Sequence, residues 1–288
     1  TKGNTLTLRK FNVKPITVTD MLRENTISLP AASLIWAGIE YELSALVTGG
    51  TATGKTVLLG ALCSFFPPNQ RIISVEDTRE IQLPKYLHWI PMITREPNVE
   101  NKGEITMLDL IINSLRMRPD RIVVGEIRRQ REAETLFEAM HTGHSVYSTL
   151  HANDTEETVN RLINPPINVP KSSLSAISII IIMYRNRRTG IRRVFQISEI
   201  EKDSTAKVLM QHDIRSDKML AASKSQRLMP ELQMQTGFTE QEINQDLKEK
   251  SNILAWLVKK NINEVDDIGK VVATYYIDKQ KLFNLIKK

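Results

Sequence analysis

A glycine-rich stretch near the start of the chain, TGGTATGKTVLL at residues 48–59, has residue types that can bind phosphate. Gly49, Gly54, Lys55 and Thr56 match the pattern G-x-x-x-x-G-K-[ST]. Glycines let backbone N–H groups turn toward a β-phosphate, Lys55 can reach the β and γ oxygens, and Thr56 can offer its hydroxyl to Mg²⁺. A flexible linker is the alternative, but a strand-like run precedes the pattern and a helix-like run follows it. We therefore expect the loop to bind ATP and Mg²⁺ through Gly49, Gly50, Thr51, Ala52, Thr53, Gly54, Lys55, Thr56 and Val57.

Acidic residues end two further apolar runs of the chain. The run RIVVGE ends at Glu126, and the run RIISVED ends at Glu76 and Asp77. The carboxyl ends of sheet strands form the edge where α/β folds bind ligands. Glu126 is therefore the expected Mg²⁺ ligand together with Thr56, and either Glu76 or Asp77 could hold the attacking water. A surface position for Glu126, and a turn or helix N-cap for Asp77, are the alternatives.

Three of the five histidines lie close together, at His141, His144 and His151. Gly143 and the alternating run after it put His144 and His151 near the ends of a strand. A histidine beside a phosphate can donate to an oxygen and respond to the presence of the γ-group. We expect His144 and His151 to take part in catalysis, whereas His141 lies on a helical pattern and is expected to be an ordinary core or surface residue.

These candidates must be positioned by alternating strands and helices. Between residues 44 and 200, short β-type runs alternate with amphipathic helical patterns, which predicts a parallel or mixed sheet wrapped by helices. After about residue 203 the sequence becomes polar and rich in methionine, and Thr239 and Glu242 open a helical pattern with a capping box. The predicted strands are residues 44–49, 71–77, 88–93, 121–126, 145–151, 178–185 and 192–200, with helices at 106–118 and 130–140.

The composition of the chain limits its environment and its partners. Its 288 residues are 41% apolar, enough for a buried core, and the net charge of +6 permits an acidic partner. The one cysteine, Cys63, excludes an internal disulfide and a cysteine-based zinc cluster, and is typical of a reducing compartment. The longest apolar run, 176–184, is about half the length that crosses a bilayer and predicts a buried strand. We therefore expect a cytoplasmic protein.

In this order the motifs resemble one family, the secretion and pilus-assembly ATPases of type II and type IV secretion systems, which include archaeal flagellar and pilus motors. GGTATGKT is similar to the Walker A motif of that family, VEDTREI to its Asp box, RMRPDRIVVGEIR to its Walker B motif and TGHSVYSTLHAN to its His box. The stretch 253–276 also resembles the C-terminal helices of archaeal members.

The resemblance implies an α/β fold: a P-loop NTPase (RecA-like) core with a central, mostly parallel sheet, followed by a helical C-terminal appendage. Family members carry a separate N-terminal domain, and residues 4–11 alternate like a strand without a nearby partner. We therefore expect a chain that begins inside a longer protein. The expected domains are 1–40 (the end of a truncated N-terminal domain, a linker and a first helix), 41–202 (the ATPase core) and 203–288 (the appendage).

The resemblance also implies roles for particular residues. Glu76 is expected to activate water, and Asp77 is expected to support it without contacting the water itself. Glu126 is expected to be the Walker B acid. Arg118 resembles an arginine that reaches the γ-phosphate from a neighbouring protomer, as do Arg95 and Arg116. Ordinary solvated charge is the alternative for all three arginines. Lys55, Glu76, Glu126, His144, His151 and Arg118 are accordingly the expected catalytic residues.

The function predicted from the sequence is that of a hexameric motor that hydrolyses ATP to power filament assembly or protein secretion. Its expected partners are further copies of itself, a polytopic inner-membrane platform protein at the cytoplasmic face of the membrane and, indirectly, pilin-like or secreted substrates. The alternative is a nucleic-acid translocase or a conjugation-type ATPase. Aromatic residues make up only 6% of the chain, and Trp36, Trp89 and Trp256 lie in apolar patterns rather than beside basic clusters, so nucleic acid is not expected as a partner.

Overall fold

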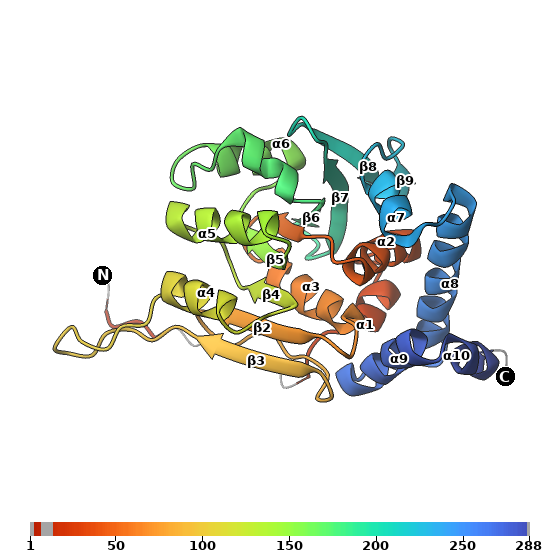
Figure 1. Cartoon of the computed structure of the whole chain (residues 1–288), viewed down its shortest axis with the longest axis horizontal. Helices are drawn as coiled ribbons and strands as arrows, with labels where there is room; N and C mark the ends of the chain where they lie inside the picture. Colours follow the sequence, from red (N-terminus) through yellow and green to blue (C-terminus); the bar gives the residue numbers. More distant parts are fainter. Residues whose placement is uncertain (1–2, 7–13, 287–288) are drawn as a thin grey trace.

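A mixed sheet of nine strands runs through the part of the chain described by the computed structural model, residues 3–6 and 14–286 (Figure 1). The strand order is β3-β2-β4-β5-β1-β6-β7-β8-β9. From β3 to β6 all neighbouring strands are parallel, and from β6 to β9 they are antiparallel. The strands are β1 (Ala45–Gly49), β2 (Arg71–Glu76), β3 (His88–Ile93), β4 (Arg121–Val124), β5 (Ser145–Leu150), β6 (Ile179–Arg185), β7 (Arg192–Ile200), β8 (Ala206–Asp213) and β9 (Lys218–Ala221).

The first seven strands confirm the runs predicted from the sequence, while β8 and β9 do not. Residues 206–221 were expected to belong to a helical segment, but they form an antiparallel hairpin on the edge of β7. Within its turn, the Asp213 carboxylate accepts from the backbone N–H and hydroxyl of Ser216, and Asp217 has a left-handed φ of 51°. Hydrogen bonds from β8 to the free edge of β7 stabilise this hairpin. The helical prediction was wrong because such contacts with a distant strand cannot be inferred from the local composition. The predicted strand at residues 4–11 lies mostly outside the described residues, and residues 4–6 form no strand.

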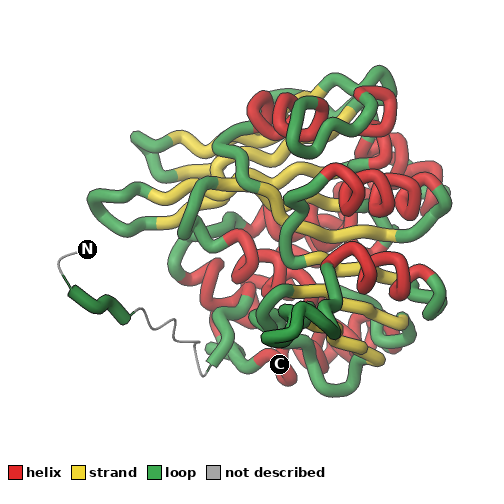
Figure 2. The backbone as a smooth tube through the Cα atoms, turned by 90° about the vertical axis from the view of Figure 1, so that its left-hand side faces the viewer, coloured by secondary structure: helices red, strands yellow, loops and turns green. Residues whose placement is uncertain are grey.

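Helices cover both faces of the sheet (Figures 1 and 2). Because side chains alternate along a strand, Ile179 and Ile181 of β6 enter one apolar cluster while Ile180 and Ile182 enter the other. Most of the apolar run 176–184 therefore lies in the buried central strand β6, as predicted, although residues 176–178 precede the strand and Tyr184 is exposed. No described helix is both long enough and apolar enough to cross a membrane. On the first face lie α1 (Val18–Arg23), α2 (Leu29–Glu40) and α3 (Lys55–Leu62), and on the second lie α4 (Met107–Leu115), α5 (Gln130–His141) and α6 (Thr155–Ile163).

The C-terminal helices pack on the first face. They are α7 (Leu228–Thr236), α8 (Glu240–Lys259), α9 (Val265–Ile277) and α10 (Lys279–Ile286), and the predicted capping box of Thr239 and Glu242 begins α8. Lys250 of α8 is fully buried, and its Nζ lies 2.7 Å from a Glu40 carboxylate oxygen of α2 and 3.0 Å from the Tyr275 hydroxyl of α9. Charged and apolar contacts thus join these helices to the same core as the sheet.

The carboxyl ends of the parallel strands all meet at one edge of the sheet. The chain leaves β1 at Gly49, β2 at Glu76, β4 just before Glu126 and β5 just before His151. Most of the residues expected to do chemistry are therefore brought to one place, as the predicted parallel sheet requires.

Candidate functional site

The loop between β1 and α3 has a backbone conformation that requires glycine at some positions. Ala52 and Gly54 are left-handed, with φ of 60° and 96°. Gly49 has φ of 152°, and a Cβ there would lie 2.5 Å from the carbonyl oxygen of Met183, so only glycine fits. The Thr53 hydroxyl donates to the carbonyl of Gly50 at 2.9 Å. Helix α3 begins immediately after Gly54 without a side-chain cap, which leaves its first backbone N–H groups available to an anion.

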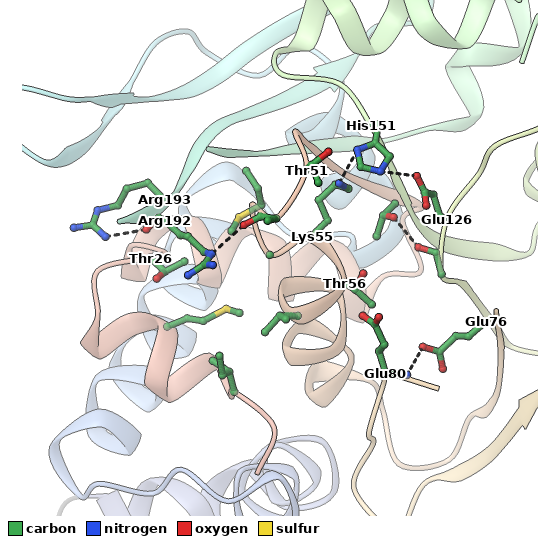
Figure 3. Close-up of a pocket in the computed structure, with 18 of the residues that line it drawn as sticks. Thr26, Thr51, Lys55, Thr56, Glu76, Glu80, Glu126, His151, Arg192 and Arg193 are labelled. Atoms are coloured by element: carbon green, nitrogen blue, oxygen red, sulfur yellow. Dashed lines mark hydrogen bonds and ion pairs between the residues drawn. The ribbon is translucent and has the colours of Figure 1, made fainter. Parts of the chain in front are cut away.

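A cavity of about 1100 Å³ opens over this loop (Figure 3). One wall comes from the carboxyl ends of β2, β4 and β5, and the other from α1 and the turn between β6 and β7. The cavity lining includes Thr51, Ala52, Gly54, Lys55, Thr56, Glu76, Asp77, Glu126, Arg128, His151, Arg192 and Arg193, together with Asp20 and Glu24 of α1.

Lys55 lies at the centre of the cavity and is only 8% exposed. Its Nζ donates to the Gly50 carbonyl at 3.1 Å and lies 3.1 Å from Nδ1 of His151. Burial lowers the pKa of Lys55, although the Glu126 charge opposes this effect. Burial, and then the Lys55 charge, lower the pKa of His151. A neutral His151 ring therefore accepts from Lys55 through Nδ1 and donates through Nε2 to Glu126 Oε1 at 3.0 Å.

Arg128 joins the two acidic strand ends, and reasoning from sequence did not identify it as functional. Its Nε and Nη2 bind Glu126 Oε2 at 2.9 and 2.7 Å, and its Nη1 pairs with Asp77. Asp77 also accepts from the Thr94 hydroxyl at 3.2 Å. The spacing Glu126-x-Arg128 at the end of a strand is the signal that could have suggested this contact.

Glu76 is 2% exposed and has one oxygen without a hydrogen-bond partner among the described residues. Its Oε1 accepts from the backbone N–H groups of Glu80 and Ile81 at 3.0 and 3.1 Å, while Oε2 has no such partner. Burial raises the pKa of the carboxyl, and the two backbone hydrogen bonds only partly offset this effect. A buried carboxylate oxygen at the wall of a cavity can orient a water molecule and accept a proton from it.

Two side chains fit a magnesium ion bound with a nucleotide. The Thr56 hydroxyl at the start of α3 and the Glu126 carboxylate line the same cavity. Mg²⁺ in such sites is bound by one or two protein oxygens together with phosphate oxygens and water. The residue types and their common cavity therefore suit this ion.

Within the loop, Gly49, Gly50 and Thr53 do not themselves line the cavity, and outside the loop four predicted residues do not line it either. His144 precedes β5, at the edge of the sheet opposite His151, and its Nδ1 lies 3.2 Å from the Ala139 carbonyl. Arg116 and Arg118 precede β4 at that same opposite edge. Arg95 lies in the extended segment between β3 and α4, bridged to Ile105 (Figure 1). Within one chain, these four side chains are not brought to a ligand held at Lys55.

Two arginines at the start of β7 do line the cavity, although no motif singled them out. Nε of Arg192 donates to the Ala52 carbonyl of the loop at 3.2 Å. Arg193 forms a bidentate pair with Asp217, with Nε–Oδ1 at 2.7 Å and Nη2–Oδ2 at 2.8 Å. Their only signal in the sequence is a general excess of basic residues near 185–193.

Comparison with known proteins identifies relatives along most of the chain. A family model described as type II/IV secretion system protein matches residues 1–240. The uncharacterized protein MJ1287 of Methanocaldococcus jannaschii is 36% identical over 260 residues, covering 88% of this chain and 96% of that protein. The putative conjugal transfer protein Rv3659c of Mycobacterium tuberculosis is 39% identical over 163 residues, covering 56% of this chain but only 46% of that protein.

A solved structure supports the fold. The crystal structure of the VirB11 ATPase from the Brucella suis type IV secretion system, in complex with sulphate, has a TM-score of 0.51 to this chain at 21% identity. The match covers 68% of this chain and 66% of that one. At this identity the likeness concerns the fold alone, and it confirms the predicted class, a RecA-like α/β core with a helical C-terminal part.

Proposed function

Because the chain belongs to the type II/IV secretion system protein family, we propose that it binds ATP with Mg²⁺ at Lys55 and hydrolyses it to drive transport across a membrane. The observation that carries this proposal is the convergence of Lys55, Glu76 and Glu126 on one cavity above a phosphate-binding loop. These three side chains suit roles that recur in P-loop enzymes: a lysine that binds phosphate, a residue that positions the attacking water and a carboxylate that holds Mg²⁺.

Each residue has a separate part in the proposed reaction. Lys55 and the first N–H groups of α3 bind the phosphates, and Lys55 exchanges its contact with His151 for phosphate oxygens when the nucleotide enters. Glu76 orients the attacking water through Oε2 and accepts its proton. Burial raises the pKa of Glu76 toward neutral pH, which makes the carboxylate a better proton acceptor. Thr56 and Glu126 hold Mg²⁺, whose chemistry when bound is to neutralise charge on the β and γ oxygens.

We also propose that the working unit is a homohexamer. His144, Arg116 and Arg118 lie at the sheet edge opposite the cavity, where a neighbouring copy could approach, and Arg95 lies in an extended segment. An arginine supplied by a second subunit can raise the rate of phosphoryl transfer by about 10³- to 10⁵-fold. Such a ring would act on a polytopic platform protein at the cytoplasmic face of the membrane, and through it on pilin-like or secreted substrates.

A conjugation-type ATPase is the second candidate, because the relative Rv3659c is named as a putative conjugal transfer protein. The two candidates share the nucleotide chemistry and differ in the cargo. Salt-dependent binding of single-stranded DNA by the purified chain would favour the second candidate, whereas its absence would favour transport of protein.

The test compares Lys55→Ala with Lys202→Ala, a control at an exposed lysine in the turn between β7 and β8. Binding is followed with a fluorescent ATP analogue in the presence of Mg²⁺, and turnover by release of phosphate. We expect Lys55→Ala to abolish both at unchanged circular dichroism, and Lys202→Ala to match the parent. Equal nucleotide affinity in all three proteins would refute the proposed site.

A further inference from the structure

Two neighbouring arginines at the start of β7 have different charge environments. Arg193 is neutralised by its bidentate pair with Asp217, and its Nη1 also donates to the carbonyls of Glu24 and Arg192 at 3.1 and 2.8 Å. Arg192 is exposed and forms no ion pair with any residue that the structure describes. Of the two, Arg192 alone keeps a charge that is free to bind an anion.

Arg192 is also held in place above the phosphate-binding loop. Its Nε donates to the Ala52 carbonyl, and its Cδ lies 3.5 Å from the position that a Cβ would take on Gly54. The hydrogen bond from Arg193 to the Arg192 carbonyl, together with the pair between Arg193 and Asp217, fixes the backbone at this point. Arg192 therefore needs little rearrangement to contact a ligand lying on the loop.

The acidic residues Glu76 and Glu126 lie on the other side of Lys55 from Arg192 (Figure 3). Figure 3 shows Arg192 and Glu126 on opposite sides of the Lys55 side chain. Arg128 is paired with Glu126 and Asp77 there, so its charge is already balanced. Asp20 and Glu24 on α1 face the same cavity as Arg192, but neither forms an ion pair with it. A polyphosphate bound at Lys55 would therefore meet an unpaired cation on the Arg192 side.

We propose that Arg192 binds the phosphate groups of the nucleotide from the same subunit and completes the cradle on the side opposite Glu126. This inference rests on the proposed function, in which the loop binds ATP, and adds a residue and a recognition mode to that site. The guanidinium can donate two parallel hydrogen bonds to phosphate oxygens, and each is strengthened by the opposite charges. The ligand class is a nucleoside di- or triphosphate, recognised through phosphate rather than through the base.

The test measures Mg²⁺-dependent binding of a fluorescent ATP analogue, and its displacement by inorganic tripolyphosphate, which has no base or sugar. Removing one charge-assisted contact weakens binding by roughly 10- to 100-fold. We expect Arg192→Ala to weaken ATP and tripolyphosphate by similar factors in that range. Arg192→Lys, which keeps the charge but not the fork, should fall between Arg192→Ala and the parent. Arg188→Ala, at an exposed arginine in the same turn but outside the cavity lining, is the matched control and should bind like the parent.

Two results would overturn the inference while the proposed function stands. Arg192→Ala could bind ATP and tripolyphosphate as tightly as the parent, or it could weaken ATP while leaving tripolyphosphate unchanged, which would indicate contact with the base or sugar. If the parent chain itself bound neither compound, the proposed function would fail and the inference with it. Because Arg192 is exposed, unfolding temperatures of the variants are expected to equal that of the parent.

Discussion

Replacing Glu76 by glutamine separates the proposed role in hydrolysis from binding and folding. Glutamine keeps the carbonyl oxygen that can accept from the backbone N–H groups of Glu80 and Ile81. It removes only the negative charge and the basic oxygen Oε2, which has no hydrogen-bond partner among the described residues. The variant is therefore expected to fold normally and to lose the group that accepts a proton from water.

Replacement of Glu76 is expected to affect the rate of hydrolysis, the affinity for ATP and the stability of the fold to different extents. Loss of a general base slows catalysis by about 10²- to 10⁴-fold, or roughly 3 to 5 kcal/mol in the activation barrier. Binding of ATP should change by less than about threefold, since water positioning acts mainly in the transition state. Glu76→Ala, in contrast, would leave the buried N–H group of Ile81 and the partly buried N–H group of Glu80 without their acceptor, and the loss at Ile81 alone costs about 1–3 kcal/mol in stability.

Stability should also depend on pH in a defined direction. Burial raises the pKa of Glu76 above its ordinary value of 4.5, so the folded state favours the protonated carboxyl. The contribution of this group to stability is therefore present below pH 4.5 and is lost as pH rises through the folded pKa. Because glutamine does not titrate, the unfolding temperature of Glu76→Gln relative to the parent should increase between pH 4 and pH 8.

The assay combines phosphate release, binding of a fluorescent ATP analogue and thermal unfolding at several pH values. Glu138→Gln, at an exposed position of α5 outside the cavity lining, is the matched control. If the parent hydrolyses ATP and Glu76→Gln does so at a rate within threefold, Glu76 is not the base. A difference in unfolding temperature that does not change with pH would refute the interpretation of its burial.

Two further predictions concern the loop and the core. Gly49→Ala should lower the unfolding temperature and abolish ATP binding, because the added Cβ would lie 2.5 Å from the Met183 carbonyl oxygen. Gly60→Ala on α3, where a Cβ meets no atom within 4 Å, should instead stabilise the fold by about 0.5–1 kcal/mol, and equal effects of the two changes in thermal unfolding would contradict the loop geometry. Lys250→Met should cost about 3–5 kcal/mol because it leaves the largely buried Glu40 carboxylate without its ion-pair partner, while Asp246 keeps only Lys279, with Nζ at 3.7 Å, as an ion-pair partner among the described residues. Lys248→Met at an exposed position should stay within about 0.5 kcal/mol in chemical denaturation. A parent-like Lys250→Met would mean that this buried pair adds nothing to the attachment of α8.

The sequence alone predicted the strand, loop and helix around Lys55 and the run of strands beside them. Gly49, Gly54, Lys55 and Thr56 lie between the end of β1 and the start of α3, so their spacing fixes their relative positions through local backbone geometry. The strands that end at Glu76 and just before Glu126 were predictable for a related reason. The pattern of apolar residues identifies a strand, and parallel strands end at a common edge. The same rule puts His144 at the opposite edge, because it precedes β5 while His151 follows it.

Only the tertiary structure decided which side chains face one another across the cavity. Strand order makes β5 the neighbour of both β1 and β4, which lets His151 reach Lys55 and Glu126. The placement of β7 beside β6 brings Arg192 over the loop, next to Ala52, which lies 140 positions earlier in the sequence. Strands β8 and β9 then continue the sheet beyond β7, in a segment whose composition had indicated helix. Such contacts depend on the order and register of strands, which are set by packing and hydrogen bonding between distant segments. A local sequence pattern predicts the secondary structure of a segment but does not predict which strands become its neighbours in the sheet.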